Sequence, residues 1–283
     1  MNIHAIHTGS VRIKTAQIEG RGRGLRRRLG PFVDRHWSDW LPTYTWVIDH
    51  PEGVIVVDTG QGRHLLESSR AFHPYHRWEV AFRIELEEEI GPQLRALGVG
   101  PRDVKRVVLT HLHCDHDGGL SHFPDSEILV SPGELRAARG WMGRARGYLP
   151  QRWPSWFDPV PLDLAAHAFG PFVASTRLTQ AGDVVAVGTP GHTADHISVA
   201  VVEGEITYFL AGDASYNERL MLAGKVDGVS ADDEVAERTL RAIRCYVRDH
   251  RTVYLPTHDP ESGSRLASRR VTVGSSGTDG LRC

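Results

Sequence analysis

Short apolar runs rich in β-branched residues recur along the chain, and each of them ends in a polar or ionisable side chain. The five clearest runs are GVIVVDTG, KRVVLTHLHCDH, DVVAVGTPGH, ITYFLAGD and RTVYLPTHD. Runs this apolar are typical of strands that are buried on both faces of a sheet. Because residues at the carboxyl ends of such strands can meet at one edge of a fold, we expect these polar ends to converge.

Helical patterns lie between the strand-like runs, so the sequence predicts an α/β fold class. Residues 85–97 are expected to form a helix that is interrupted or restarted at Gly91-Pro92, and residues 131–139 a second, capped helix. The clearest helix is expected over residues 231–250, where apolar positions fall largely on one face and acidic residues precede basic ones.

Two segments, residues 20–46 and 140–161, combine tryptophan with Arg, Pro or Gly and are expected to be irregular loops that cover another part of the molecule. From about residue 262 onward the chain is rich in Ser, Gly and Arg. We therefore expect one domain over residues 1–262 and a flexible tail over residues 263–283.

Composition narrows the class of protein. A chain of 283 residues that is 40% hydrophobic can bury a sizeable core, and its net charge of -2 gives no general signal for binding polyanions. Three cysteines are not a disulfide framework, which favours a reducing compartment. The start, MNIHAIHTGSVRIK, lacks the apolar core of a signal peptide, and no run approaches about 18 apolar residues. We expect a cytoplasmic protein with no membrane partner.

The stretch VVLTHLHCDHDGGL concentrates metal-binding residue types at the end of one run. His111, His113 and Asp115 alternate, so an extended segment would point them to the same side. His116 breaks the alternation and faces elsewhere unless the chain turns, and the glycine pair that follows allows a turn. One stretch could therefore serve two metal positions, with the first two histidines at one and Asp115 and His116 at the other.

Three further candidate ligands, His192, Asp213 and His258, end later strand-like runs. Imidazole together with carboxylate suits a divalent ion such as Zn, with Mn, Co and Fe as alternatives. A carboxylate such as Asp213 can bridge two ions. With the four residues of the first stretch, these side chains are enough for two sites that keep open positions.

The order of these motifs resembles the metallo-β-lactamase superfamily. The matching elements are, in order, DTG (58–60), THLHCDHDGG (110–119), TPGHTADH (189–196), GDASY (212–216) and PTHD (256–259). The resemblance implies a four-layer αββα sandwich with a dinuclear metal site on one edge, and thus a hydrolase domain over residues 1–262. It also implies the distribution of ligands: a first ion held by His111, His113 and His192, a second held by Asp115, His116 and His258, and both bridged by Asp213.

A narrower resemblance concerns the N-acyl-homoserine lactonase branch of the superfamily. In that branch a tyrosine three residues after the bridging aspartate faces the substrate, as Tyr216 would here. The early segment TYTWVIDHPEGVIVVDTG is similar to that branch as well. Cys114 stands where the lactonases usually carry a large apolar residue, and it is our candidate for a second substrate contact. Asp195 replaces a frequent glycine near His196. We expect His196 and Asp58 to contact the metal ligands without binding the metal themselves, and Asp58 to orient a ligand histidine.

These features predict a metal-dependent hydrolase that opens the lactone ring of N-acyl homoserine lactones and so silences bacterial signalling. Two divalent ions can share a water and lower its pKa from about 15.7 toward about 7, which yields a hydroxide that bridges them. The hydroxide would attack the lactone carbonyl, and Tyr216 would help to stabilise the oxyanion. Asp115 is the candidate that carries a proton to the leaving alkoxide.

Other functions remain open on the sequence. The same site could act on a thioester, as in glyoxalase II, on an aryl ester or on an organophosphate. The arginine run over residues 21–28 suggests a module that binds nucleic acid or a signal molecule. The balanced net charge argues against that module, so no nucleic-acid partner is expected, and a homodimer is left open.

An acyl chain also needs an apolar groove, and three aromatic groups are candidates to line it. They lie at residues 37–46, at residues 72–82 with the spacing of one helix face, and at residues 141–157. Aromatic stripes are more often part of a core, which is the favoured interpretation for each group.

Overall fold

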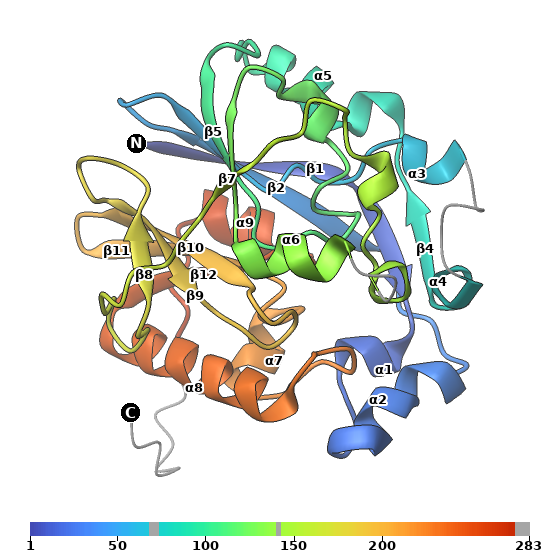
Figure 1. Cartoon of the computed structure of the whole chain (residues 1–283). Coiled ribbons are helices and arrows are strands. Elements are labelled where there is room, and N and C mark those ends of the chain that lie inside the picture. Colours follow the sequence, from blue (N-terminus) through green and yellow to red (C-terminus); the bar gives the residue numbers. More distant parts are fainter. Residues whose placement is uncertain (68–73, 140–142, 275–283) are drawn as a thin grey trace. The chain divides into compact units, whose positions relative to one another are not determined.

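The computed structural model describes residues 1–67, 74–139 and 143–274 of the chain (Figure 1). The chain divides into two compact units, each built around one β-sheet. The first unit comprises Met1–Lys14 and Trp37–Leu162, and the second comprises Thr15–His36 and Asp163–Cys283. Among the described residues, no helix has the length and apolar character needed to span a bilayer.

The first unit holds a seven-stranded sheet in the order β4-β1-β2-β3-β5-β6-β7. Its strands are β1 (Asn2–Ile13), β2 (Leu41–Asp49), β3 (Val54–Val57), β4 (Val80–Arg83), β5 (Val104–Val108), β6 (Glu127–Val130) and β7 (Val160–Pro161). Pairing is antiparallel from β4 to β3 and parallel from β3 to β7. The strands β3 and β5 therefore end at the same edge, which brings the residues that follow them together.

Short helices accompany this sheet: α3 (His64–Glu67), α4 (Pro74–Glu79), α5 (Ile90–Ala96) and α6 (Pro132–Arg139), with 3-10 turns at Leu86–Glu88, Leu120–His122, Arg144–Arg146 and Pro150–Arg152. Ile90 and Leu94 of α5 and Ala138 of α6 pack in one core with strand residues such as Val56 and Val107. Burial of these apolar side chains fixes both helices on the sheet.

The helix expected over residues 85–97 is present, but its break lies before Ile90 rather than at Gly91-Pro92. Pro92 is the third residue of α5, within the first turn of the helix. Backbone N–H groups of a first turn have no partner inside the helix, so a proline costs nothing there. The helix expected over residues 131–139 is confirmed as α6.

The second unit holds a five-stranded sheet in the order β12-β11-β10-β9-β8. Its strands are β8 (Ser175–Arg177), β9 (Val184–Gly188), β10 (Ile197–Glu203), β11 (Ile206–Gly212) and β12 (Arg251–Pro256). Its helices are α1 (Thr15–Ile18), α2 (Gly24–Val33), α7 (Glu218–Leu222), α8 (Asp233–Asp249) and α9 (Ser262–Ala267). Pairing is antiparallel except between β11 and β12, which are parallel.

The longest helix, α8, confirms the helix expected over residues 231–250 and runs along this sheet (Figure 1). It begins after Asp232, whose side chain accepts a hydrogen bond from the backbone N–H of Val235, as helix N-caps do. Its apolar face, including Leu240 and Ile243, packs in one core with Phe209 of β11.

The loop expected over residues 20–46 is wrong, because that segment contains α2 and most of β2. Arg27 is buried in α2 and donates hydrogen bonds to the backbone carbonyls of Asp227 and Ser230. Strand β2 pairs with both β1 and β3, and its Trp46 is 1% exposed. Both elements depend on contacts with residues far away in the sequence, which the local pattern does not reveal.

The aromatic groups proposed as a groove are divided among separate elements. Trp78 lies in α4 and Phe82 in β4, so the single helix face expected over residues 72–82 is wrong; Phe72 lies outside the described residues. Trp153 and Phe157 pack against the core of the first unit, whereas Trp141 lies outside the described residues.

Part of the segment expected to be a tail is ordered on the second sheet. Helix α9 lies within it, and the buried guanidinium of Arg265 donates a hydrogen bond of 2.9 Å to Asp259. Thr272 then donates its backbone N–H to the carbonyl of Thr252 in β12. Residues 275–283 lie outside the described part of the chain.

Asp34 accepts hydrogen bonds from the first turn of α1, and its protonation is expected to make the stability of the protein depend on pH. Its Oδ2 accepts hydrogen bonds of 2.8 Å from the backbone N–H of Ala16 and from the hydroxyl of Thr15. Burial raises the pKa of Asp34, but hydrogen bonds from His36, Ala16 and Thr15 outweigh it and hold the pKa well below 3.8.

Asp34→Ala is expected to reduce the free energy of unfolding by about 1 kcal/mol at neutral pH, the usual cost of losing a capping side chain. Because the folded pKa lies below the unfolded value of 3.8, the stabilisation by Asp34 is present above that pH and disappears as pH falls through the folded pKa. Urea titrations of both proteins at neutral and acidic pH would show the difference shrinking with acidification. A difference that stays constant with pH would contradict this account.

Candidate metal centre

In the first unit, Asp58 organises the loop that follows β5. It directly follows β3, has a positive φ of 59°, and is 1% exposed. Aspartate is among the few residues that adopt this conformation readily. The turn directs its Oδ1 to the backbone N–H of Thr110, at 2.7 Å, and its Oδ2 to Nδ1 of His116, at 2.8 Å. Asp58 therefore occupies the position from which a carboxylate orients a ligand histidine.

These hydrogen bonds also fix which nitrogen of each histidine can bind a metal. The hydroxyl of Thr110 donates to Asp58, so it accepts the Nδ1–H of His111 at 3.0 Å. His116 donates its Nδ1–H to Asp58. In both rings Nε2 is thereby left with its lone pair, which is the form that coordinates metal.

The ring nitrogens of this loop gather at one place. Nε2 of His111 lies 3.0 Å from Nδ1 of His113, and the ring centroids of His111 and His116 are 4.0 Å apart. The chain turns after His113, since the N–H of His116 donates to the carbonyl of His113. The turn places ligand atoms of Asp115 and His116 within 4.8 Å of each other. The first unit thus brings together all four residues that the sequence predicted in this stretch.

Cys114 lies in the same turn but points into a small apolar cluster. It is 5% exposed and packs with Leu65, Leu149 and the partly buried Phe82. Burial raises the pKa of its thiol well above the usual value, so the side chain is an uncharged apolar surface. The predicted contact between Cys114 and substrate stays a prediction.

In the second unit, His192, Asp213 and His258 follow β9, β11 and β12 and converge. Oδ2 of Asp213 lies 3.5 Å from Nε2 of His192 and 3.5 Å from Nε2 of His258. The parallel strands β11 and β12 set this arrangement, because the pairing of Gly212 with Pro256 aligns the ends from which two of the ligands follow. One carboxylate between two imidazoles is a geometry suited to bridging two cations.

Tyr216 lies beside both of these imidazoles. Its ring stacks on that of His258 with centroids 5.6 Å apart, and it meets the ring of His192 edge-on at 6.4 Å. The side chain is 7% exposed. The phenol therefore lies next to two of the candidate ligands in the second unit, and its predicted contact with substrate stays a prediction.

His196 supports the Asp213 loop with both of its ring nitrogens. Nε2 accepts the backbone N–H of Asp213 at 3.1 Å, so the proton is on Nδ1, which donates to the hydroxyl of Thr189 at 2.9 Å. That hydroxyl contacts Ser198, which donates to the carbonyl of Ala211 in β11. This hydrogen-bonded chain holds the backbone of Asp213 in place.

Asp227 is a supporting residue that the sequence analysis missed. Its Oδ2 lies 3.3 Å from Nδ1 of His192, and its Oδ1 accepts the N–H of Val229 at 2.8 Å. Burial raises the pKa of Asp227, but hydrogen bonds from His192 and Ser230 outweigh it, so the pKa lies below 3.8. Asp227 does for His192 what Asp58 does for His116. In the sequence Asp227 is followed by a glycine, a common pair in loops. Nothing in that pattern indicates a residue that supports a ligand.

Asp227→Asn is expected to weaken Zn binding about 10- to 100-fold, the usual cost of losing a carboxylate behind a ligand histidine. Competition with a chromophoric chelator measures this directly. The matched control is Asp249→Asn, because Asp249 is an exposed carboxylate that pairs with Arg248. Equal affinities in the two variants would show that Asp227 does not support the ligand.

Two more buried carboxylates were also missed in the first unit. Glu134 of α6 is 1% exposed and accepts the N–H of Leu112, which lies between two candidate ligand histidines, and the hydroxyl of Tyr148. Burial raises the pKa of Asp117 to about 8, and the indole N–H of Trp153 donates to it at 2.6 Å. Both residues tie the ligand loop to neighbouring segments.

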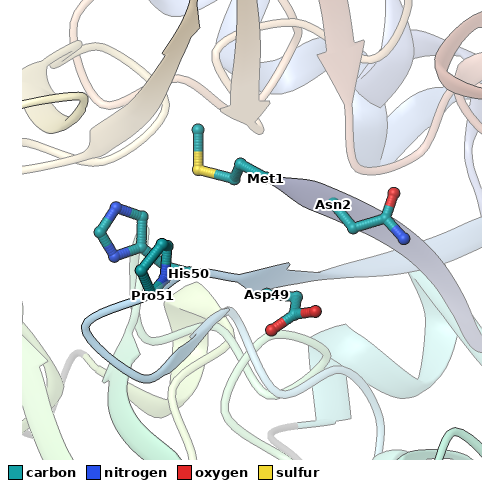
Figure 2. Close-up of a pocket in the computed structure, with 5 residues that line it drawn as sticks. All are labelled: Met1, Asn2, Asp49, His50 and Pro51. Atoms are coloured by element: carbon teal, nitrogen blue, oxygen red, sulfur yellow. The ribbon is translucent and has the colours of Figure 1, made fainter.

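A pocket elsewhere in the first unit contains none of the predicted site residues. Figure 2 shows its lining, which consists of Met1, Asn2, Asp49, His50 and Pro51. These residues lie at the start of β1, at the end of β2 and in the turn before β3, and Asp58 follows the other end of β3. The pocket and the ligand loop are therefore at opposite ends of this strand.

Comparison with known proteins agrees with the motif order and the two-sheet architecture. The family model described as the metallo-beta-lactamase superfamily matches residues 38–258. The chain belongs to the metallo-β-lactamase superfamily. Members of this superfamily are hydrolases that bind divalent metals, typically zinc, and the buried imidazoles and carboxylates of each unit are donors of the matching kind.

Individual relatives support the same assignment. A probable metallo-hydrolase of Mycobacterium tuberculosis is 30% identical over 78% of this chain and 72% of its own length. An N-acyl homoserine lactonase of Rhizobium radiobacter is 27% identical over 78% of this chain and 83% of its own. The metallo-β-lactamase superfamily that the sequence predicted is thus confirmed, and its similarity to N-acyl homoserine lactonases is borne out by relatives with that name.

The fold is confirmed by solved structures. An N-acyl homoserine lactone hydrolase with N-hexanoyl-L-homoserine at its catalytic metal centre superposes with a TM-score of 0.72. The match covers 95% of this chain and 96% of that chain at 19% identity. The predicted α/β class is therefore correct, and two sheets flanked by helices are what the αββα architecture requires.

Proposed function

We propose that this chain is a dinuclear metallohydrolase that opens the lactone ring of N-acyl homoserine lactones. The observation that carries the proposal is the grouping of Tyr216 with His192, Asp213 and His258 in the second unit. The spacing of Tyr216 from Asp213 is that of the lactonase branch, and relatives named as N-acyl homoserine lactonases cover most of the chain.

The proposed ligands are the seven predicted residues, divided between the two units. One ion would be held by His111, His113 and His192, a second by Asp115, His116 and His258, and both by Asp213. Zinc is the proposed metal, with Co, Mn and Fe as alternatives. When bound, such a pair of ions supplies a Lewis acid and lowers the pKa of water toward neutrality.

The side chains of the site would position the lactone and transfer a proton to its leaving oxygen. The hydroxyl of Tyr216 would donate a hydrogen bond to the carbonyl oxygen of the lactone as negative charge develops there. Asp115 would carry a proton to the oxygen of the ring that leaves as an alkoxide. Asp58 and Asp227 would keep the ligand rings of His116 and His192 in their tautomers while this happens.

A substrate panel on the zinc-loaded protein tests the proposal. The panel contains N-acyl homoserine lactones of several chain lengths, a glutathione thioester, an aryl ester and an organophosphate triester, each followed by chromatography. The proposal expects ring opening of the acyl lactones that stops with a chelator and returns with Zn or Co. Intact lactones beside rapid turnover of another member would reassign the substrate while leaving the metallohydrolase in place.

We also propose a partner and a location for the protein. The partner is a small acyl lactone, with no nucleic acid, and the location is the cytoplasm. Fractionation of cells that express the full chain, with the lactonase assay applied to each fraction, measures the location directly.

A further inference from the structure

Helix α2 presents a continuous apolar stripe to solvent. Leu25, Leu29, Phe32 and Val33 are 77%, 56%, 51% and 76% exposed. At 3.6 residues per turn these four positions fall within about a third of the helix circumference. Contiguous exposed apolar surface on a folded protein usually marks an interaction site.

The opposite face of α2 is fixed to the second unit, so the stripe is not free to rotate inward. Arg27 and Pro31 are buried on that face. Arg27 donates to two backbone carbonyls, one of which belongs to Ser230, and its Nε lies 3.7 Å from Asp233. The backbone N–H of Gly24 also donates to Asp233, at 2.8 Å. The helix is thus held by the face that carries Arg27 and Pro31, and the four apolar side chains lie on the exposed face.

Positive charge borders the stripe on both sides. On the helical wheel Arg26 and Arg28 flank the four apolar positions, and both are exposed. Residues 21–36 contain six arginines, all exposed except Arg27, and a single acidic residue, Asp34, whose carboxylate is engaged by Thr15 and Ala16. An isologous contact between two copies of α2 would bring these arginines face to face, which is repulsive.

We propose that α2 docks on the surface of an anionic lipid bilayer. A helix with an apolar stripe and basic borders lies in the headgroup region, with its apolar residues below and its arginines at the level of the phosphates. The contact is peripheral and uses no spanning helix. It is an alternative to the expectation that the protein has no membrane partner, and it does not depend on the proposed lactonase activity.

Vesicle co-sedimentation of the full, metal-loaded protein tests this proposal. We expect binding to vesicles of phosphatidylcholine mixed with phosphatidylglycerol, little binding to phosphatidylcholine alone, and loss of binding as salt rises. The double variant Leu29→Glu/Phe32→Glu should reduce binding at least about tenfold. Replacing Arg26 and Arg28 by glutamine should reduce it about fivefold for each arginine.

A matched variant controls for added negative charge. Leu97→Glu/Val173→Glu changes the net charge equally at residues that are 43% and 83% exposed outside α2, and it should bind like the wild type. Equal binding to neutral and anionic vesicles, or equal loss in the two double variants, would overturn the proposal. A wild-type dimer in sedimentation equilibrium that only Leu29→Glu/Phe32→Glu dissociates, without vesicle binding, would make a second copy the occupant and also overturn it.

Discussion

Replacing Asp213 by asparagine is expected to lower lactone hydrolysis by about 10³-fold and to reduce the metal content of the purified protein. Oδ2 of Asp213 is 3.5 Å from both His192 and His258, so it is the one side chain proposed to contact both ions. Lewis-acid stabilisation is worth several kcal/mol, and each 1.4 kcal/mol or so corresponds to about a factor of ten in rate. Elemental analysis together with the lactonase assay measures both effects.

Two comparisons make the Asp213 result specific. Wild-type protein stripped by a chelator should fall to the same low activity as Asp213→Asn, and only the wild type should recover on addition of zinc. Asp163→Asn makes the same chemical change at an exposed carboxyl group in the second unit and should leave metal content and rate unchanged. Full activity and full metal content in Asp213→Asn would refute the proposed bridging role.

Tyr216→Phe is expected to slow turnover about 10²-fold, the effect of removing one donor to an oxyanion, while the metal content stays the same. Phenylalanine keeps the ring that stacks on His258 and meets His192, so this variant removes only the hydroxyl. The loss should appear in kcat rather than in KM, because the hydrogen bond strengthens as charge develops.

Tyr254→Phe is the matched control for Tyr216→Phe. Its hydroxyl is buried and lies 2.9 Å from that of Ser215, the neighbour of Tyr216. Removing it should cost about 1 kcal/mol of stability without changing the rate. If Tyr216→Phe behaves in the same way, with lower stability and an unaltered rate, Tyr216 has a packing role only.

The strands that the sequence predicted are those whose patterns are local. The runs before Asp58, His192, Asp213 and His258 are apolar over their whole length, and all four form strands. A strand that is buried on both faces of a sheet needs apolar residues at every position, so it can be recognised from a short stretch of sequence. The polar residues at the ends of these strands could therefore be identified from the sequence.

The elements that the sequence failed to predict owe their structure to distant contacts. The aromatic residues of β2 favour a covering loop, yet β2 is an interior strand of its sheet and its Trp46 is buried. The arginine run and glycines of α2 are typical of a loop, yet the segment is helical. Its helical form depends on the burial of Arg27 against the segment that carries Asp227.

In the candidate site, too, some residues have a local sequence pattern and others depend on distant contacts. Its seven ligand candidates stand in recognisable motifs, whereas Asp227 and Glu134 hold ligand segments from positions with no motif around them. A carboxylate that supports a ligand needs only to arrive within hydrogen-bonding distance in the folded chain. Its position along the sequence is therefore unconstrained, and only the structure identifies it.

The alignment of β11 with β12 bears on how the protein can be engineered. Asp213 and His258 leave the same end of two parallel strands, so their separation depends on the sheet and not on the length of the connecting segments. At the far end of β11, Gly204 adopts a φ of 59° in a hairpin turn with open space around it. A fluorescent reporter or an affinity tag inserted at that hairpin would leave the geometry of both side chains intact.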